Sequence, residues 1–407
     1  MVSVRRAGDI GAGEAFLLAF VVLFPLGPRF ETQLGNIYLA TLATLIWLTG
    51  WTVFVFAGPR DGLSMATGPQ RALLTYGGFL VVQLLLHLGG LLEKPAALFR
   101  GVQLLAYMAL FATISSLRLD RRSVRRILHA SLVVLAAECA LAWWMRDVAR
   151  HGFLAGTFDD EHNSFAAYAL LMACVLFGSI ALKSRSRSRL LLGGLFLLVL
   201  ASLVFSFSRT AYLAGPVAIL AIIHRRWGHR ALLRSAFALG VLLSLLGLAI
   251  PASVRDRFTS ILQIAGGGSD ISFMTRIALW HAALDELVRT GFLGVGPFGF
   301  TRFDNYYVTS LAETGPVGLL LFLWLVVALL RWLARVYRDE IDPSLRALAL
   351  GLYGATVGLF VVTNMAADMF HVHRVMGLYW VLAGSLMAAR SSSGSVELPA
   401  VKRLRLP

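Results

Sequence analysis

Three short passages of the sequence gather residue types that could carry chemistry. Carboxylates and imidazoles can transfer protons, and a guanidinium group can hold an anion through paired hydrogen bonds. Asp159, His162 and Asn163 crowd the first passage, and Arg209 stands in the second. The passages are residues 156–166 (GTFDDEHNSFA), 205–211 (FSFSRTA) and 304–318 (DNYYVTSLAETGPVG). A charge at the mouth of a membrane helix is a functional candidate, although Arg209 alone could also extend its charged end to the membrane surface.

Long apolar segments must position these passages. Of 407 residues, 58% are hydrophobic and 14% charged, whereas soluble domains are roughly 45–50% apolar. A membrane-spanning helix needs about 20 apolar residues, so the composition predicts an all-α membrane protein with about 12 transmembrane helices and excludes a soluble enzyme. The apolar runs lie near residues 15–27, 37–56, 72–92, 101–117, 127–145, 163–182, 190–207, 210–223, 235–251, 315–332, 347–363 and 375–389.

The basic residues predict how these helices are oriented. Lys and Arg collect in cytoplasmic loops, and placing both termini in the cytoplasm puts 25 of the 37 basic residues on that side. This N-in/C-in topology explains the net charge of +15 without any nucleic-acid partner. We expect residues 1–390 to form a single polytopic membrane domain and residues 391–407 to form a disordered cytoplasmic tail.

One loop on the opposite side of the membrane is much longer than the others, at residues 252–314. Long connections in helical bundles are usually functional. Within this loop the stretch Phe273–Leu293 predicts an amphipathic helix, lying on the bundle or at the membrane surface. Its apolar residues at helical spacing are Ile277, Trp280, Ala283, Leu284 and Leu287. All three polar passages fall on this same side.

The passage at residues 304–318 resembles the signature of the O-antigen ligase and polymerase family of bacterial glycosyltransferases. That signature is His-Asn, nine residues, then Gly-x-x-Gly. Asn305, the nine residues Tyr306–Thr314, Gly315 and Gly318 fit it, while Asp304 stands where the family has histidine.

Further passages of the chain resemble the family in the same order, so that the likeness covers roughly residues 150–390. Ser208-Arg209 is similar to the family's Ser-Arg pair. Arg276 followed by Trp280 and then Gly294–Phe300 is similar to its Arg-x-x-x-Trp and Gly-x-Gly passages, and residues 156–166 resemble another shared stretch.

The resemblance implies a GT-C-like fold and a defined reaction. A glycan would move en bloc from an undecaprenyl-pyrophosphate carrier to a sugar hydroxyl, on the periplasmic side of the bacterial inner membrane. The partners would be this donor, a glycan or lipid A-core acceptor, and the bilayer, with no cofactor and no metal. The departure at Asp304 favours a surface-polysaccharide or exopolysaccharide polymerase slightly over an O-antigen ligase.

The resemblance also implies roles for individual residues. Arg209 and Arg276 would neutralise the leaving pyrophosphate, and Asp304 would inherit the position of the base that activates the acceptor hydroxyl. Alternatively, Asp304 caps a helix. The candidates for substrate binding are Asn305, Glu313, Asn163, His162, Asp159, His371 and His373.

Other readings of the sequence remain open. The string Gly294–Gly299 fits the dinucleotide pattern GxGxxG, but no predicted strand precedes it, so we expect a turn. His371 and His373 with Asp368 form a weak metal pattern, and a polar lining of the site is the better interpretation. Glu138 lies inside an apolar run and could pair across helices with Arg100. A lipid-linked glycan flippase or another polytopic transporter is the alternative function, and a non-catalytic membrane subunit is a further one.

Overall fold

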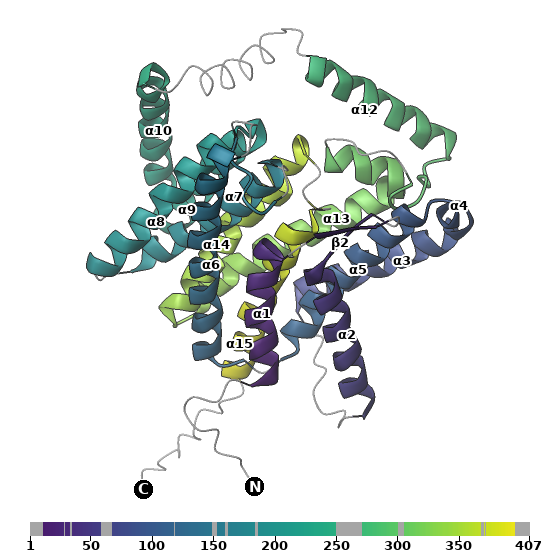
Figure 1. Ribbon diagram of the computed structural model, residues 1–407, viewed down its shortest axis with the longest axis horizontal. Helices are drawn as coiled ribbons and strands as arrows, with labels where there is room; N and C mark the ends of the chain where they lie inside the picture. Colours follow the sequence, from purple (N-terminus) through teal and green to yellow (C-terminus); the bar gives the residue numbers. More distant parts are fainter. Residues whose placement is uncertain are drawn as a thin grey trace, which may run out of the picture.

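The computed structural model is a bundle of helices with a single small hairpin among the residues it describes (Figure 1). This confirms the predicted all-α class. The described residues are 11–27, 29–32, 35–57, 67–117, 119–148, 153–158, 162–183, 186–249, 271–299, 305–367, 370 and 372–394.

The first half of the bundle runs from α1 to α8. The hairpin pairs two antiparallel strands between α1 and α2 and was not predicted from the sequence. The elements are α1 (Ala12–Leu26), β1 (Arg29–Thr32), β2 (Gly35–Tyr38), α2 (Leu39–Ala57), α3 (Gly68–Leu86), α4 (Leu88–Leu92), α5 (Pro95–Ser115), α6 (Arg121–Val148), α7 (His162–Leu182) and α8 (Ser186–Phe205).

The second half contains the segments that resemble the family most. Its elements are α9 (Arg209–Trp227), α10 (His229–Ala249), α12 (Ile271–Arg289), α13 (Tyr306–Asp339), α14 (Pro343–Thr356), the π-helix η1 (Val357–Val362), the 3₁₀ turn η2 (Thr363–Met365) and α15 (His373–Gly394). The first residues of the predicted tail therefore continue α15 as far as Gly394, and residues 395–407 lie outside the described residues.

Each of the twelve predicted apolar runs coincides with helix in the part of the chain that the structure describes. Six described segments are long and apolar enough to cross a membrane: Pro95–Ser115, Arg121–Met145, His162–Leu182, Arg187–Phe205, Tyr306–Asp339 and Pro343–Met365. The chain is thus a helical membrane protein. The full count of twelve spans and their orientation stay predictions.

Helix α7 lies at the centre of the bundle, packed against α14, α8 and α9. Where α7 crosses α14, Gly178 and Gly351 face the other helix's backbone. A Cβ on Gly178 would lie 2.6 Å from the Ala347 carbonyl oxygen, and a Cβ on Gly351 would lie 2.6 Å from Val175 Cα. Small residues allow such close approach between helices in a membrane, where packing replaces the hydrophobic driving force.

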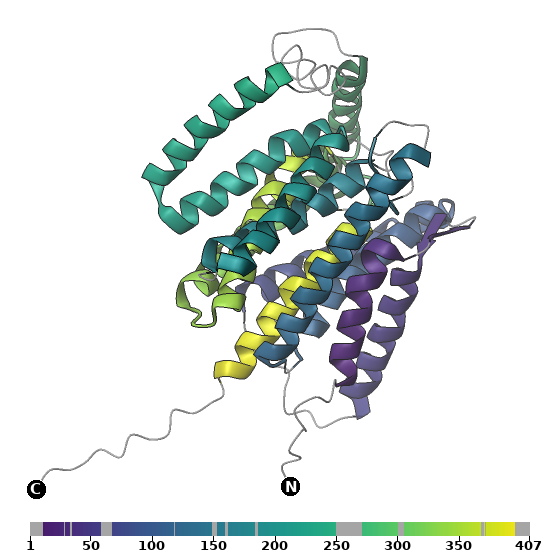
Figure 2. The ribbon, with the colours of Figure 1, turned by 60° about the vertical axis from the view of Figure 1, so that its left-hand side comes forward.

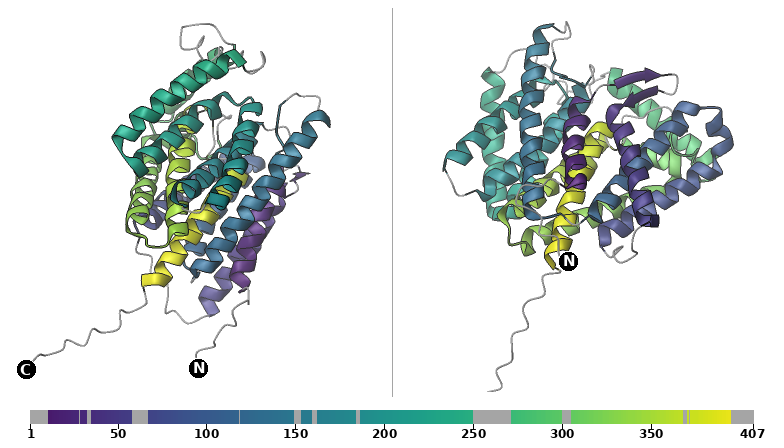
Figure 3. Two further views of the ribbon diagram at one scale, coloured as in Figure 1. Left: turned by 90° about the vertical axis from the view of Figure 1, so that its left-hand side faces the viewer. Right: turned by 60° about the horizontal axis from the view of Figure 1, so that its bottom comes forward.

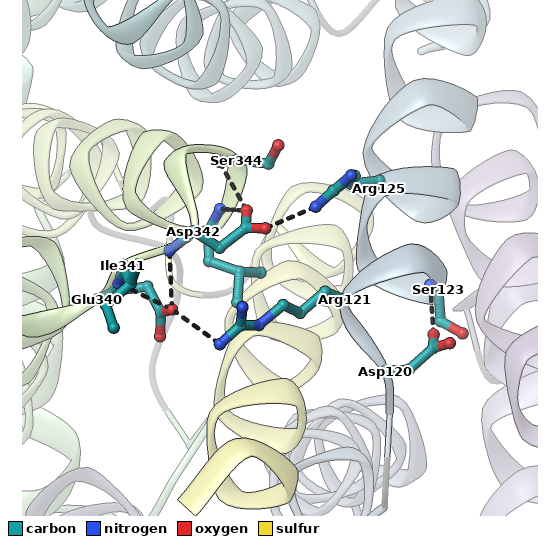
Figure 4. A network of polar contacts seen from close by, with 9 residues as sticks. Asp120, Arg121, Ser123, Arg125, Glu340, Ile341, Asp342 and Ser344 are labelled. Carbon is teal, nitrogen blue, oxygen red and sulfur yellow. Dashed lines mark hydrogen bonds and ion pairs between the residues drawn. The ribbon is translucent and has the colours of Figure 1, made fainter.

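Charged side chains join several helix ends at the end of the bundle where α1 begins and α15 ends (Figures 1 and 2). We call this set the polar rim: Glu14, Asp120, Arg121, Arg125, Arg126, Asp339, Glu340, Asp342 and Arg390. Arg125 pairs with Asp342 at 2.6 Å and Arg121 with Glu340 at 3.8 Å, which ties α6 to the connection between α13 and α14 (Figure 4). Ser123 and Arg126 of α6 bind Glu14 of α1.

The predicted amphipathic helix is present as α12, which lies toward the opposite end of the molecule from the start of α1 (Figures 1 and 3). Ala283 and Leu287 are buried, and Ala283 packs with Leu279 against Val308 and Ala312 of α13. Leu284 of the predicted stripe is exposed, so the packed face is narrower than the sequence indicated. The long loop 252–314 therefore supplies a helix that covers the beginning of α13.

Candidate functional site

The signature residues form a short helix of their own. Inside α13 the backbone of Gly315 is not helical (φ 67°, ψ −175°), and Pro316 follows it. The break separates Tyr306–Thr314, here called the signature helix, from the long helix that continues to Asp339. The Asn305 side chain accepts hydrogen bonds from the backbone N–H groups of Tyr307 (3.0 Å) and Val308 (3.2 Å). Asn305, rather than Asp304, is therefore the N-cap, which corrects the capping alternative given above.

The break at Gly315 is fixed by the Gly-x-Gly passage. A Cβ on Gly315 would lie 2.2 Å from the Phe292 carbonyl oxygen, so no larger residue fits there. The N–H of Gly296 donates to the carbonyl of Glu313 (2.9 Å), and that of Val295 donates to Ala312 (3.1 Å). These bonds satisfy carbonyls at the end of the signature helix that the break leaves without helical partners. Residues 294–299 contain a turn at Pro297 and Phe298 and no helix or strand, in agreement with the predicted turn.

Two tyrosines anchor the other side of the signature helix. The hydroxyl groups of Tyr306 and Tyr76 are 2.6 Å apart, which links the helix to α3. The Tyr307 hydroxyl donates to the carbonyls of Phe360 (2.8 Å) and Val361 (3.0 Å) in the π-helix η1. π-Helical turns are rare and often found at functional sites. No residue pattern marks a π-helix, so η1 could not be predicted from the sequence.

A second group of candidate residues lies where α7 and α9 begin. The Ser208 hydroxyl donates to Asn163 Oδ1 at 2.8 Å, and Arg209 follows as the first residue of α9. The His162 ring packs against Phe153, with ring centroids 4.8 Å apart. The structure therefore joins two of the three predicted passages directly.

A buried cluster that the sequence analysis did not assign to the site holds the loop before α7. Arg374, 4% exposed, donates to the carbonyls of Phe24 (2.8 Å) and Thr157 (2.7 Å) and lies over the Phe158 ring at 4.2 Å. Glu138, fully buried, accepts from the Thr157 N–H at 2.8 Å and from its hydroxyl at 3.0 Å. Arg374 could have been noticed as a charge heading an apolar run, like Arg209. Thr157, in the loop before α7, is thus one partner of Glu138, and the pairing of Glu138 with Arg100 stays a prediction.

The connection between η2 and α15 brings the two groups of residues to the same end of the bundle. The Tyr306 ring of the signature helix packs on Phe370, with centroids 5.0 Å apart. A few residues further on, His373 stacks on Tyr107 (5.4 Å, 25°), and Arg374 holds Thr157. Helix α9 packs against η1 and η2, so these two short elements lie between the Arg209 group and the signature helix.

The remaining candidate residues lie on α12, in the signature helix, or outside the described residues. Arg276 and Trp280 are partly buried on α12, the helix that covers the signature helix, and Glu313 is buried within the signature helix itself. Asp304, Asp159 and His371 lie outside the described residues.

Much of this candidate site lies in a segment of the chain that matches a protein family. Residues 194–323 match the family model described as O-antigen ligase. The resemblance to this family is confirmed. The matched segment contains Ser208-Arg209, Arg276, Trp280 and Asn305–Gly318, which are the motifs in the second half of the chain. The match indicates a membrane glycosyltransferase of the ligase or polymerase type, acting on polysaccharide and lipid substrates. Comparison with curated proteins gives no match.

Proposed function

We propose that this chain transfers a glycan en bloc from an undecaprenyl-pyrophosphate carrier to a sugar hydroxyl, at the periplasmic face of the bacterial inner membrane. One observation carries the proposal: the signature residues build a capped nine-residue helix that ends at Thr314, directly before the break at Gly315, and lies beneath the arginine-bearing helix α12. It lies inside the segment that matches the O-antigen ligase family.

The residue types suit this reaction. The acceptor oxygen attacks C1 of the donor sugar, the bond from C1 to the pyrophosphate oxygen breaks, and the acceptor proton passes to a base. We assign Arg209 and Arg276 to the departing pyrophosphate, because guanidinium groups stay charged and bind phosphate through two hydrogen bonds. We assign Asp304 to the base.

The other candidates fall into two sets. Asn305 and Glu313 are buried, so we assign them to holding the signature helix in place for the substrate. Asn163 and His162, beside Ser208-Arg209, are assigned to the sugar, as are Asp159, His371 and His373.

We infer a polymerase of surface or exopolysaccharide repeats in preference to an O-antigen ligase, because the family's histidine is replaced by Asp304. The two activities differ in the acceptor. Purified protein supplied with the lipid-linked repeat alone would lengthen it if it is a polymerase. A ligase would need lipid A-core, and product formed only with that acceptor would overturn the preference.

The roles of the charged residues are tested by paired variants in a transfer assay. We expect Arg209→Ala and Arg276→Ala to lower the rate by about 100-fold, as loss of one group that stabilises transition-state charge does. Arg226→Ala, at the other end of α9, and the exposed Arg289→Ala on α12 are the matched controls and should keep the rate. Asp304→Ala should lose activity while Asp285→Ala keeps it. Near wild-type rates in a site variant would remove that residue from the mechanism.

The orientation is tested by thiol labelling in cells whose outer membrane has been opened. Both native cysteines, Cys139 and Cys174, are buried and give little background. A membrane-impermeant reagent should label Ala282→Cys, exposed on α12, and should not label Lys183→Cys, exposed beyond the end of α7. The reverse pattern would invert the topology.

A further inference from the structure

Two arginines that the reaction does not use meet at one tyrosine ring. The guanidinium carbon of Arg346 lies 5.4 Å from the centroid of Tyr337, and that of Arg225 lies 6.0 Å from it. Arg225 comes from the end of α9, Tyr337 from the end of α13, and Arg346 from the start of α14. Three helix ends therefore bring two positive charges to one buried ring beside the polar rim.

These two arginines differ from the neighbouring arginines in having no carboxylate as a partner among the described residues. In the polar rim and beside it, arginines pair with acidic groups: Arg121 with Glu340, Arg125 with Asp342, Arg126 with Glu14, and Arg338 with Asp339. Arg225 and Arg346 form no ion pair with any residue that the structure describes. The acidic groups of the α13–α14 connection are already engaged, since Asp339 also lies 3.8 Å from Arg390.

What holds the two guanidinium groups is the backbone of α13. Arg225 donates to the Ala334 carbonyl at 2.8 Å, and Arg346 donates to the Tyr337 carbonyl at 3.3 Å. Cations near a helix C-terminus are favourable, which explains their position. A guanidinium has five N–H donors, however, and one carbonyl bond leaves most of the charge uncompensated.

Partial burial makes this excess charge costly. Both side chains are partly buried, and Arg225 Nε is buried with no hydrogen-bond partner among the described residues. Removing a charge from water without a counter-charge is unfavourable, so an external anion that reaches both groups would stabilise the three helix ends. The ring of Tyr337 and the two carbonyls already hold the arginines in place, which lowers the entropy cost of binding.

The residues next to Arg225 indicate that the anion is the headgroup of a membrane lipid. Next to Arg225, the Arg226 side chain lies over Trp227 at 5.6 Å, and Trp227 is 49% exposed. Exposed tryptophan and arginine at the end of an apolar helix are typical of the headgroup layer of a membrane. Basic pockets between helices on the cytoplasmic side bind acidic lipid headgroups, and this end holds the start of α1 and the end of α15 (Figures 1 and 2), which we place in the cytoplasm.

We propose that Arg225, Arg346 and Tyr337 form a binding site for the phosphate of an anionic phospholipid in the cytoplasmic leaflet. The lipid joins the ends of α9, α13 and α14, and so stabilises the half of the bundle that carries the signature helix. The site is independent of the glycan-transfer activity and is tested without it.

The test is the thermal stability of purified, delipidated protein in detergent. Added phosphatidylglycerol should raise the melting temperature by about 3 °C or more, and phosphatidylcholine should not. The double variant Arg225→Gln/Arg346→Gln should lose most of this shift. The control Arg331→Gln/Arg335→Gln removes two exposed charges from α13, the helix that carries Tyr337, and should keep the shift.

Three results would overturn the proposal: a full shift in the Arg225→Gln/Arg346→Gln variant, an equal shift with phosphatidylcholine, or the whole shift reproduced by inorganic phosphate. A shift reproduced by inorganic phosphate would mean that the site binds a free anion and not a lipid. If the double variant fails to fold, the single variants serve in its place. Native mass spectrometry should then show each of them retaining fewer phosphatidylglycerol molecules than the wild type, and equal retention would contradict the site.

Discussion

The Ser208 hydroxyl donates a hydrogen bond to Asn163 Oδ1 at 2.8 Å and so joins the first turn of α7 to the residue before Arg209. We expect Asn163→Ala to lower the transfer rate by about fivefold, because one positioning hydrogen bond contributes roughly 1 kcal/mol. Asn163→Asp keeps an acceptor oxygen and should retain most of the rate. Asn163 is exposed, so the melting temperature should not change, and a large fall in it with both variants would contradict a positioning role.

Gly315 is expected to be irreplaceable for the fold. Its positive φ is unfavourable for other residues, and any Cβ would collide with the Phe292 carbonyl oxygen. Gly315→Ala should therefore abolish or strongly reduce the yield of monodisperse protein. The control is Gly78→Ala in α3, where no atom lies within 4 Å of the added Cβ and alanine favours the helix by up to about 1 kcal/mol. Equal yields of the two variants would contradict the observed break.

Arg374 is expected to be a major contributor to stability. Its loss would remove the donor from the carbonyls of Phe24, which is buried, and Thr157, which is partly buried, and breaking a buried charged network costs about 3–5 kcal/mol. Arg374→Gln should lower the free energy of unfolding in mixed micelles accordingly. Arg289→Gln, an exposed arginine paired with Glu286, should leave it unchanged. Wild-type stability of the Arg374→Gln variant would show that the cluster does not hold the loop before α7.

The polar rim makes stability depend on pH through Asp342. Burial raises its pKa, but the hydrogen bond from Arg125, the N–H groups of Leu345 and Ser344, and the Arg125 charge outweigh burial, so the pKa lies below the ordinary 3.8. A lowered folded-state pKa means that the carboxylate stabilises the fold above pH 3.8 and that this contribution is lost as the pH falls through the folded value.

The variant Asp342→Asn isolates this contribution. Its melting temperature should lie well below that of the wild type at pH 7, and the two should converge as the pH approaches 3. A difference of the same size at both pH values would show that the contribution comes from packing and not from the charge.

The sequence predicted the parts of the structure that depend on local composition. Apolar runs placed the helices, and the spacing of Ala283 and Leu287 predicted α12. The family signature placed Asn305 and Gly315, and the structure adds their physical roles, as a cap and as a break. The capping alternative at Asp304 was wrong by one residue, because either Asp or Asn can cap a helix and only the backbone geometry decides between them.

The parts that depend on three-dimensional neighbours could not be predicted. Arg374 binds Thr157 from more than two hundred positions away in the sequence, and nothing in the local pattern of either residue indicates the other. The π-helix η1 could not be predicted from the sequence either, since the Tyr307 hydroxyl that binds its Phe360 carbonyl comes from another helix. That Arg225 and Arg346 both reach the Tyr337 ring depends on how α9 and α14 pack beside the end of α13.

The most direct test of the proposed function is to follow both products of one reaction in a single detergent solution, with no membrane compartments. Purified protein and the undecaprenyl-pyrophosphate-linked repeat should yield lengthened glycan and one free undecaprenyl pyrophosphate for each new glycosidic bond, and the Arg276→Ala variant should yield about 100-fold less of both. Donor that remains intact in detergent, but crosses the bilayer when the same protein is placed in vesicles, would contradict a glycosyltransferase and identify a lipid-linked glycan flippase.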